Sequence, residues 1–553
     1  MAVSGGAMVV RALEALGVRH VFGIVSVHNL PILHAIAESE TITAVNMRHE
    51  QAAVTAADGY ARATGGLGVA LTSTGPGAAN AMGGLFEAQF ASSRVLMITG
   101  QVDSRFYGQG RSFLHEAEGQ REMLGSVVRE VASVRRTVDI GAAVTRAATA
   151  VMTGRPRPAA VEIPIDLQYA TDEMPPLPDA APPPAHPDDA RLRRAAELLA
   201  AAERPLLWTG GGVISAGAEA ELRALAEDLN VPVVTSVEGR GALPEDHPLC
   251  LGALTTTPEV REIVAGADVV LAVGTRFQML PTAHWTARPT GDLIHLDADP
   301  SMIGRTYPVA LGIVADARDG LAAIYRHLPG GAGGGHEEWT KRAGEAAAAG
   351  RAALRERIGP DHRAMCDAIR AHLPDDGPIV RDATVPAYSW GDRLLPVLRA
   401  RTSLRTVSAA IGPGLPLAIG AATGTGRRTV LIQGDGGLML SVGELAAVAQ
   451  YRMPITICVF NDRGYGVLRR IESATFGANH DVDLATPRFA ELAETFGIPG
   501  RRVTTAADFE EAFADSAGTD GPSLIEVDIT EMAPITYPTG GGTPDWDRLA
   551  PTD

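Results

Sequence analysis

The sequence predicts an α/β protein built from three doubly wound parallel-sheet domains. The chain has 553 residues, which is enough for about three or four domains of ordinary size. Short apolar, β-branched runs alternate along it with amphipathic helical stretches, a pattern typical of parallel strands joined by right-handed crossover helices. Two breaks in composition cut the chain into three parts of similar size, so we expect one sheet in each part.

These breaks set the expected domain boundaries. The stretch 174–189 is rich in proline, which is excluded from helix interiors and central strands and favours an extended linker. The stretch 329–359 begins with a glycine-rich run and continues as an alanine-rich helix. We therefore expect domains at residues 1–173, 190–328 and 360–532, followed by a tail at 533–553.

The strands are predicted from buried apolar runs of five to seven or so residues. In the first domain they lie at 21–25, 42–46, 67–73 and 95–100, with a helix over 49–63. In the second they lie at 204–210, 231–237, 268–274 and 292–298, and in the third at 377–383, 428–436, 454–462 and 523–529. Because ligands of such sheets bind beyond the carboxyl ends of the strands, the loops after these runs are the candidate sites.

Composition narrows the function classes. The chain has 48 basic and 65 acidic residues and a net charge of −17, without a basic cluster that could follow a nucleic-acid backbone. Its three cysteines, Cys250, Cys366 and Cys458, are widely spaced, which argues against a disulfide framework or a zinc site. Neither a signal-peptide pattern nor an apolar run of membrane-spanning length is present, so we predict a cytoplasmic protein that binds neither nucleic acid nor membrane.

The strongest local motif follows the strand at 428–433. The loop Gly434-Asp435-Gly436-Gly437 leads toward a helix expected near Ser441, and glycines there let backbone amides approach a phosphate. Asp462 ends the next strand, so its carboxylate can meet that of Asp435 at one sheet edge. Two carboxylates and a carbonyl, completed by phosphate oxygens and water, suit Mg²⁺. The alternative is a tight turn with two solvated aspartates.

This motif resembles that of the thiamine diphosphate (ThDP) enzymes of the pyruvate decarboxylase and acetohydroxyacid synthase superfamily. Their pattern is GDG followed one strand later by an asparagine, and Asp462 occupies that second position here. The resemblance implies that Asp435, Asp462 and the carbonyl of Gly464 hold Mg²⁺, with Tyr465 and Gly466 beside the cofactor. Asn461 as the ligand would shorten the spacing by one residue and is the less favoured alternative.

A second motif, RHEQAAVTAADGYAR at 48–62, matches the same family. Glu50 opens a helix directly after a strand, and from this residue alone it could be an ordinary acid at a helix N-terminus. The resemblance implies instead that Glu50 hydrogen-bonds N1′ of the cofactor's aminopyrimidine and so promotes formation of the C2 carbanion. The resemblance extends over essentially the whole chain and names the domains pyrimidine-binding, central and diphosphate-binding.

Other cofactor contacts are implied by the same resemblance. Gly75 and Asn80 lie in the loop TSTGPGAAN, and Thr384 lies where the family contacts the diphosphate. Ile411 matches the apolar residue that props the cofactor into its bent form, although packing of a helix would also explain it. The carbonyl of Ala409 is expected to hold the pyrimidine.

The family's chemistry is attack of the C2 carbanion on a 2-oxo acid, loss of carbon dioxide, and an enamine that takes a proton, an aldehyde or a ketone. Leu280 and Ile471 replace the arginine and tryptophan of acetohydroxyacid synthases, which weakens the case for acetolactate synthesis. His28 matches the histidine of benzaldehyde lyase, and His115 matches a glutamine of that enzyme; both histidines could relay protons, or each could merely cap a loop. The expected substrate pocket is apolar on one side and consists of Val27, Ser73, Val467 and Leu468.

We therefore expect a ThDP- and Mg²⁺-dependent 2-oxo-acid decarboxylase or carboligase resembling acetolactate synthases. The alternatives are a hydroxyketone lyase or ligase of the benzaldehyde lyase type and a catalytically silent ThDP-binding paralogue. The resemblance also implies a homo-oligomer, at least a dimer and commonly a tetramer, whose active sites lie between subunits. The glycine-rich segment 209–218 could approach FAD, but FAD-free relatives share it, so FAD is slightly disfavoured.

Overall fold

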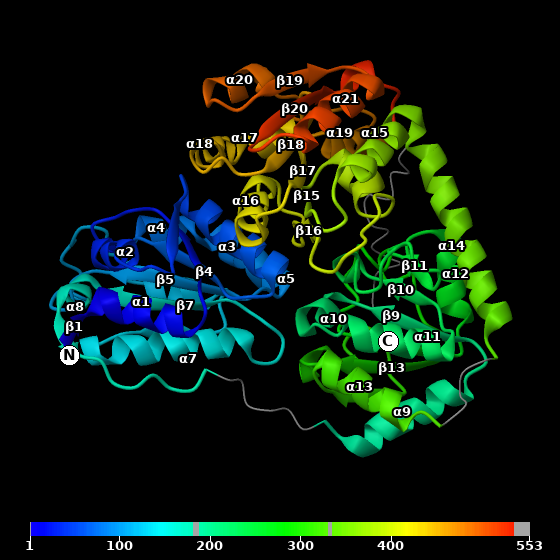
Figure 1. Cartoon of the computed structure of the whole chain (residues 1–553), viewed down its shortest axis with the longest axis horizontal. Helices are drawn as coiled ribbons and strands as arrows, with labels where there is room; N and C mark the ends of the chain where they lie inside the picture. The colour runs from blue at the N-terminus through cyan, green and yellow to red at the C-terminus, as the bar shows by residue number, and fades with distance from the viewer. Residues whose placement is uncertain (1, 181–186, 330–334, 536–553) are drawn as a thin grey trace.

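The structure, a computed structural model, describes residues 2–180, 187–329 and 335–535. It contains three six-stranded sheets, all of them parallel, each flanked by helices, which confirms the predicted fold class (Figure 1). The predicted linkers at 174–189 and 329–359 and the predicted tail at 533–553 lie partly outside the described residues, and the domain boundaries stay predictions.

The first sheet has the strand order β3-β2-β4-β5-β7-β6. Its strands are β2 (His20–Gly23), β3 (Thr43–Asn46), β4 (Gly68–Thr72), β5 (Val95–Gln101), β6 (Val131–Ser133) and β7 (Ala159–Pro164). A two-stranded antiparallel pair, β1 (Ala2–Ser4) with β8 (Thr171–Glu173), closes this domain. The helices are α1 (Gly5–Ala15), α2 (Leu30–Ala37), α3 (Glu50–Thr64), α4 (Pro76–Asn80), α5 (Met82–Ala91), α6 (Gln120–Gly125), α7 (Ile140–Met152) and α8 (Ile165–Tyr169).

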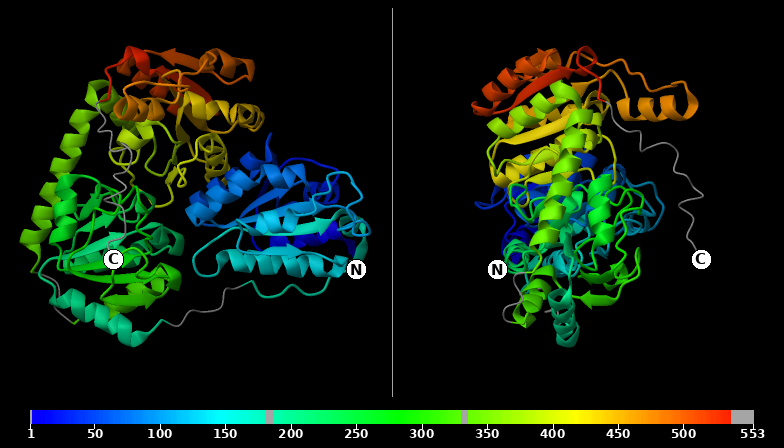
Figure 2. Two further views of the ribbon diagram at one scale, coloured as in Figure 1. Left: turned by 180° about the vertical axis from the view of Figure 1, so that it is seen from behind. Right: turned by 90° about the vertical axis from the view of Figure 1, so that its right-hand side faces the viewer.

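The second sheet has the order β11-β10-β9-β12-β13-β14. Its strands are β9 (Pro205–Thr209), β10 (Val233–Thr235), β11 (Cys250–Gly252), β12 (Val269–Val273), β13 (Asp292–Asp297) and β14 (Leu311–Val314). Its helices are α9 (Asp189–Ala201), α10 (Gly211–Ala216), α11 (Glu219–Leu229), α12 (Pro258–Gly266) and α13 (Ala317–His327). The long helix α14 (Glu337–Arg357) then runs from this domain to the third, as Figure 2 shows from behind.

The third sheet has the order β16-β15-β17-β18-β20-β19. Its strands are β15 (Ile379–Arg381), β16 (Ser403–Arg405), β17 (Thr429–Gly434), β18 (Ile455–Asn461), β19 (Gly500–Val503) and β20 (Ser523–Asp528). Its helices are α15 (Gly359–His372), α16 (Gly414–Thr425), α17 (Asp435–Met439), α18 (Leu445–Gln450), α19 (Gly466–Phe476), α20 (Phe489–Thr495) and α21 (Ala506–Ala517).

Helical structure begins next to Ser441 as expected, with a 3₁₀ turn that leads into α18, but a further short helix, α17, begins earlier, at Asp435. Gly436 and Gly437 follow β17 without a side chain to obstruct a turn, so the chain enters the short helix α17 at once. A 3₁₀ turn, Val442–Glu444, then separates α17 from α18. Asp435 therefore lies at the N-terminus of a helix and not in an open loop.

The first and third domains are joined where α3 crosses α16. A Cβ atom on Gly420 would lie 1.9 Å from the carbonyl oxygen of Ala56, and one on Gly59 would lie 2.2 Å from that of Leu417. The two backbones are in direct contact, which glycine alone permits. Because α3 begins at Glu50 and α16 follows Ile411, this crossing fixes two predicted cofactor-binding segments relative to each other. In the described part of the chain, no helix combines the length and apolar character needed to span a membrane.

Candidate active site

Glu50 is the first residue of α3, where the positive end of the helix dipole favours a carboxylate. The side-chain amide of Asn80 donates a hydrogen bond of 3.1 Å to Oε2 of Glu50. Gly77 lies on the other side, and a Cβ there would approach Oε1 of Glu50 to 3.2 Å. The structure thus brings Glu50 together with the loop 72–80 that the sequence assigned to the cofactor.

The two candidate histidines lie side by side, with ring centroids 5.1 Å apart. Gly75 makes this arrangement possible because it adopts a positive φ of 59° and leaves room for the backbone of His115, whose carbonyl oxygen would be 2.3 Å from a Cβ. His115 itself has a φ of 63°, which is uncommon for a residue with a side chain. The hydroxyl of Ser73 lies 3.3 Å from Nδ1 of His115 and 2.7 Å from the hydroxyl of Ser26.

His28 is buried in the loop between β2 and α2, with 2% of its surface exposed. Its carbonyl accepts a hydrogen bond of 2.8 Å from the side-chain amide of Gln168, which anchors the loop. Burial lowers the pKa of His28, and the neighbouring His115 lowers it further. Among the described residues Nδ1 of His28 has no hydrogen-bond partner. A buried ring nitrogen of this kind is suited to a ligand that supplies the missing hydrogen bond.

The predicted metal ligands also meet. Asp435 is 1% exposed, and its Oδ2 accepts a hydrogen bond of 2.9 Å from the backbone amide of Gly464. Burial raises the pKa of Asp435 to about 6, and the nearby carboxylate of Asp462 adds to this effect. Burial likewise raises the pKa of Asp462, although Arg469, 3.4 Å away, opposes the increase. Two adjacent carboxylates, one buried and one partly buried, are an arrangement that a cation stabilises.

Asn461 faces away from this pair. Its amide donates to Glu526 at 3.0 Å, and its oxygen accepts from the backbone of Arg463. The structure therefore places Asp462, and not Asn461, beside Asp435. The described residues contain no cluster of three or more acidic, histidine or cysteine side chains that could hold a metal alone, so a cation here would need backbone and phosphate oxygens as well. The donor set fits Mg²⁺ on those terms.

The glycines of this loop are required by close neighbours. A Cβ on Gly434 would lie 3.0 Å from the hydroxyl of Thr384, and one on Gly436 would lie 2.7 Å from the ring of Tyr465. A Cβ on Gly466 would lie 1.8 Å from Oδ2 of Asp462, and one on Gly437 would meet the carboxylate of Asp382. These contacts gather the predicted diphosphate-binding residues around one cradle.

The segment before α16 presents Ala409 and Ile411. Ala409 has a positive φ of 63°, a conformation that must be held by its surroundings. Ile411 is 38% exposed and precedes the first residue of the helix, Gly414, so it is not packed inside the helix. Leu468 and Val27, from the predicted substrate pocket, are 51% and 53% exposed, and Val467 is half-buried. Apolar side chains thus remain free on both domains.

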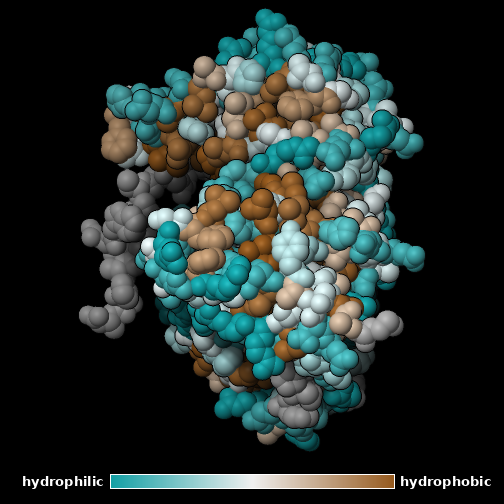
Figure 3. Space-filling model, turned by 90° about the vertical axis from the view of Figure 1, so that its left-hand side faces the viewer, coloured by the Kyte–Doolittle hydropathy of each residue, from teal (hydrophilic) through white to brown (hydrophobic). Residues whose placement is uncertain are grey.

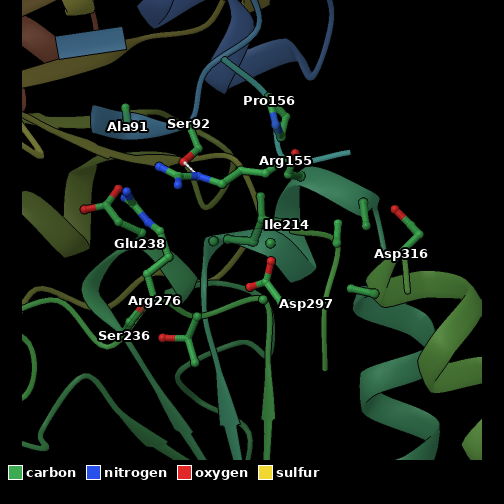
Figure 4. A pocket seen from close by; sticks show the side chains of 18 of the residues that line it. Ala91, Ser92, Arg155, Pro156, Ile214, Ser236, Glu238, Arg276, Asp297 and Asp316 are labelled. Carbon is green, nitrogen blue, oxygen red and sulfur yellow. Dashed lines mark hydrogen bonds between the residues drawn. The ribbon is translucent and has the colours of Figure 1, made fainter. Parts of the chain in front are cut away.

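A separate cavity of about 520 Å³ lies between the first and central domains. Figure 4 shows Arg155, hydrogen-bonded to Ser92 at 2.8 Å, together with Glu238, Arg276 and Asp297 around it. Burial, with the nearby charge of Arg276, lowers the pKa of Arg155 to about 10. The cavity is next to the glycine-rich segment 209–218 for which FAD was considered.

The glycines of that segment have a packing explanation. A Cβ on Gly210 would lie 2.2 Å from the carbonyl oxygen of Gly274, and one on Gly212 would lie 2.6 Å from its Cα. Two loops at the carboxyl end of the central sheet therefore approach each other backbone to backbone. The glycine-rich pattern alone does not require a nucleotide.

Sequence reasoning missed three buried carboxylates around the site, Glu87, Asp382 and Glu444. Asp382 accepts hydrogen bonds from the amide of Gly412, at 2.8 Å, and from the side chain of Gln433. Their positions carry no local motif, because each acts on a segment distant in the chain. Glu444 lies in the helical stretch that follows GDGG, and a charged residue among apolar ones was the one feature of the sequence that could have pointed to it.

Comparison with known proteins identifies the family of the chain. Three family models match in order: the thiamine pyrophosphate enzyme N-terminal TPP binding domain at 3–123, the central domain at 192–324, and the C-terminal TPP binding domain at 386–527. The chain is 30% identical to a probable acetolactate synthase large subunit of Methanocaldococcus jannaschii, over 97% of this chain and 94% of that one.

Two further relatives cover nearly the full length. The probable 2-ketoarginine decarboxylase AruI of Pseudomonas aeruginosa is 35% identical, over 95% of this chain and 94% of its own. The acetolactate synthase isozyme 3 large subunit of Escherichia coli is 30% identical, over 98% and 97% respectively. Fold and domain order define a three-domain protein that binds thiamine diphosphate. The chain belongs to the thiamine diphosphate-dependent enzyme family and is an enzyme of its decarboxylase and carboligase class.

Proposed function

We propose that this enzyme uses ThDP and Mg²⁺ to decarboxylate a 2-oxo acid and then either releases the product or couples it to an aldehyde or ketone. The observation that carries the proposal is the pair of adjacent carboxylates, buried Asp435 and partly buried Asp462, beside the glycine cradle of the C-terminal TPP binding domain. Glu50, on the N-terminal TPP binding domain, supplies the acid for the other end of the cofactor, the aminopyrimidine.

Each residue has a distinct task in this proposal. When bound, ThDP supplies a carbon nucleophile that attacks a carbonyl and accepts the electron pair released with carbon dioxide. Glu50, oriented by Asn80, holds a proton at N1′ of the aminopyrimidine. Asp435, Asp462 and the carbonyl of Gly464 hold Mg²⁺ against the diphosphate. Thr384 and the amides of the cradle bind phosphate oxygens, and Ala409 and Ile411 orient the pyrimidine.

The substrate proposal rests on the residues near the two histidines. His28 and His115 exchange protons with the substrate oxygen, because the pKa of His28 is lowered by burial and its Nδ1 is available. Val467 and Leu468 supply an apolar wall that suits a nonpolar or medium-sized acyl group and excludes water. Leu280 and Ile471 depart from the acetohydroxyacid synthase pattern, so a reaction other than acetolactate synthesis is favoured.

A second candidate function is reversible cleavage of hydroxyketones, as in benzaldehyde lyase. It is favoured by one observation, the packing of His28 against His115 at 5.1 Å. In that reaction the two imidazoles would remove and return the proton of a substrate hydroxyl group.

We also propose a homo-oligomer, at least a dimer, with the active site shared between subunits. This is supported by large apolar side chains that stay exposed beside the site: Val25, Val27, Leu30, Leu114, Ile411, Met439, Leu440 and Leu468. Figure 3, viewed from the side of the first domain, shows apolar side chains gathered in the upper half of that face. Patches of this kind mark protein interfaces or ligand sites.

FAD stays disfavoured, and absorbance of the purified enzyme near 450 nm would test it.

The experiment that tests the proposal is a substrate screen with the purified enzyme, ThDP and Mg²⁺. The panel contains pyruvate, 2-oxobutanoate, phenylglyoxylate and 5-guanidino-2-oxopentanoate, each with and without aldehyde acceptors, and products are identified by mass spectrometry. Carbon dioxide alone indicates a decarboxylase, and coupled products indicate a carboligase. Cleavage of benzoin without decarboxylation of any 2-oxo acid would support the second candidate. Absence of turnover throughout would refute both.

Two variants test the assignment of residues. Glu50→Gln is expected to abolish exchange of the C2 proton of bound ThDP for deuterium, measured by NMR, because the amide cannot take up the proton at N1′. Asp462→Ala is expected to abolish Mg²⁺-dependent retention of ThDP in an equilibrium titration. Exchange or retention at the wild-type level would overturn the respective assignment.

A further inference from the structure

The segment that precedes Glu50 is held by a carboxylate from another domain. Glu444, in the 3₁₀ turn after α17, is 1% exposed. Its two oxygens accept the backbone amide of Arg48 at 3.0 and 3.2 Å, and the amide of His49 also donates to it. These are the two residues immediately before Glu50. The acid proposed to act on the cofactor is thus anchored from the diphosphate-binding side of the same chain.

Side chains around Glu444 strengthen this junction. The hydroxyl of Tyr451 accepts the backbone amide of Asn46 at 2.9 Å. The guanidinium of Arg48 donates to the side chain of Gln450 at 2.7 Å. Since β3 ends at Asn46 and α3 starts at Glu50, these contacts attach the connecting segment 47–49 to the third domain, while the amide of Met47 donates to the carbonyl of Gly23 within the first.

The opposite segment is held in the same way. Glu87, on α5 of the first domain, is 1% exposed. Its Oε1 accepts the backbone amide of Val407 at 2.6 Å, and its Oε2 accepts the amide of Ser408 at 3.1 Å and the hydroxyl of Ser408. Ala409, whose φ is 63°, follows directly. The strained backbone that presents the pyrimidine-binding carbonyl is therefore anchored from the first domain.

We propose that Glu444 and Glu87 are reciprocal positioning residues, each holding by two consecutive backbone amides the cofactor-binding segment of the other domain. The expected effect on catalysis rests on the proposed function. The two anchors, which are the hydrogen bonds of Glu444 to residues 48–49 and of Glu87 to residues 407–408, are present in the protein without cofactor. Neither residue touches the reacting atoms.

A carboxylate is suited to this task. It offers two acceptor oxygens to two neighbouring N–H groups, and a hydrogen bond to a charged acceptor is stronger than a neutral one. A glutamine of the same shape keeps one acceptor but turns an NH₂ group toward a backbone N–H, so one buried donor loses its partner. Both segments are short connections between elements, and neither has a ladder of its own to replace the lost bond.

The two anchors predict different effects. A looser segment 46–49 would displace Glu50, whose proposed role is proton transfer. Glu444→Gln is therefore expected to lower kcat and the rate of C2 proton exchange even at saturating ThDP. Loosening 407–411 moves the residues that bind the cofactor, so Glu87→Gln is expected to raise the Kd for ThDP by about tenfold to a hundredfold. This split separates positioning from general destabilisation, which would move both quantities together.

Asp268 offers a matched control in the central domain. Its two oxygens accept two consecutive backbone amides, those of Glu203 at 2.8 Å and Arg204 at 2.9 Å. The pairing with two consecutive amides is the same as at Glu444 and Glu87, although Asp268 is only partly buried, and the segment that it holds is not a cofactor-binding one. Asp268→Asn is expected to leave the Kd for ThDP and kcat unchanged while loosening its own loop.

The first measurement is hydrogen–deuterium exchange of the full-length protein purified without cofactor, read by mass spectrometry. Glu444→Gln is expected to speed exchange in a peptide covering 46–52, Glu87→Gln in one covering 405–411, and Asp268→Asn in one covering 202–206, each by about tenfold or more. If Glu444→Gln does not fold, Tyr451→Phe, which removes the acceptor for the amide of Asn46 and a donor to the carbonyl of Ala44, is expected to speed exchange at 46–52 to a smaller extent.

The second measurement is the ThDP titration and the kinetics of the same variants. Unchanged exchange at 46–52 in both Glu444→Gln and Tyr451→Phe, or an equal loss of ThDP binding in Asp268→Asn, would overturn the inference. Failure of the wild-type protein to bind ThDP would instead overturn the proposed function, and the exchange result would still decide whether the anchors exist.

Discussion

Replacement of Gly420 by alanine tests how closely the first and third domains depend on each other. The added Cβ would lie 1.9 Å from the carbonyl oxygen of Ala56, whereas ordinary contact begins at 3.4 Å. The difference of 1.5 Å (3.4 − 1.9) must be made up by separating α3 from α16, because both atoms are close to the backbone. Overpacking lowers the free energy of unfolding by about 1–3 kcal/mol. Because backbone atoms cannot move aside easily, we expect a loss of about 3 kcal/mol here.

The expected result is a decrease in thermal midpoint of roughly 6–12 °C for a cooperative unit of domain size. ThDP binding is expected to weaken as well, because α3 begins at Glu50 and α16 follows Ile411. Differential scanning fluorimetry and a ThDP titration would measure the two effects on one preparation.

Gly344 provides the matched control. It lies in α14, and a Cβ there would meet nothing within 4 Å. Gly344→Ala is therefore expected to stabilise the protein slightly, by up to about 1 kcal/mol, since alanine has the higher helix propensity. If Gly420→Ala matched or exceeded the wild type in both stability and ThDP affinity, the account of the crossing would be wrong.

Three further substitutions test the site and its surroundings. Burial raises the pKa of Asp58 to about 6. The protonated carboxyl group therefore contributes fully to folding stability below the ordinary pKa of an aspartate, and this contribution is lost as pH rises through about 6. Asp58→Asn, followed by denaturant titration from about pH 4 to 7, is expected to gain stability relative to wild type as pH rises. His28→Ala is expected to lower kcat/KM by about 10²- to 10⁴-fold, measured by carbon dioxide release, if it transfers a proton. Gly75→Ala is expected to displace His115, whose carbonyl would be 2.3 Å from the new methyl, and to lower kcat/KM.

Most of the fold was predictable because buried parallel strands are continuous apolar runs. All twelve strands predicted at such runs are present, among them β5 (Val95–Gln101) and β18 (Ile455–Asn461). Strands such as β6 (Val131–Ser133), β16 (Ser403–Arg405) and β19 (Gly500–Val503) were missed, since they are short and lie at the edges of their sheets. Edge strands bury less surface, so their sequences carry less of the apolar signal.

The candidate site was predictable only where function is concentrated in a local motif. GDGG and RHE mark Asp435 and Glu50 because glycine and acid must stand at fixed places in one turn. Asp462 needed the assumption that two strand ends meet, which the structure supports by placing it beside Asp435. The short helix α17 was missed because its glycines were taken as a loop, although they also permit an immediate helical turn.

The sequence by itself determined the class of fold, the order of the three domains and the two motifs that identify the family. Those features depend on periodicity and on residues close together in the chain. The tertiary structure alone decided that His28 packs against His115, that Asn461 faces away from the metal site, and that Glu444 and Glu87 hold distant segments. The reason is physical: contacts between residues tens to hundreds of positions apart depend on how strands, helices and domains pack, and a single sequence carries no local pattern for such contacts.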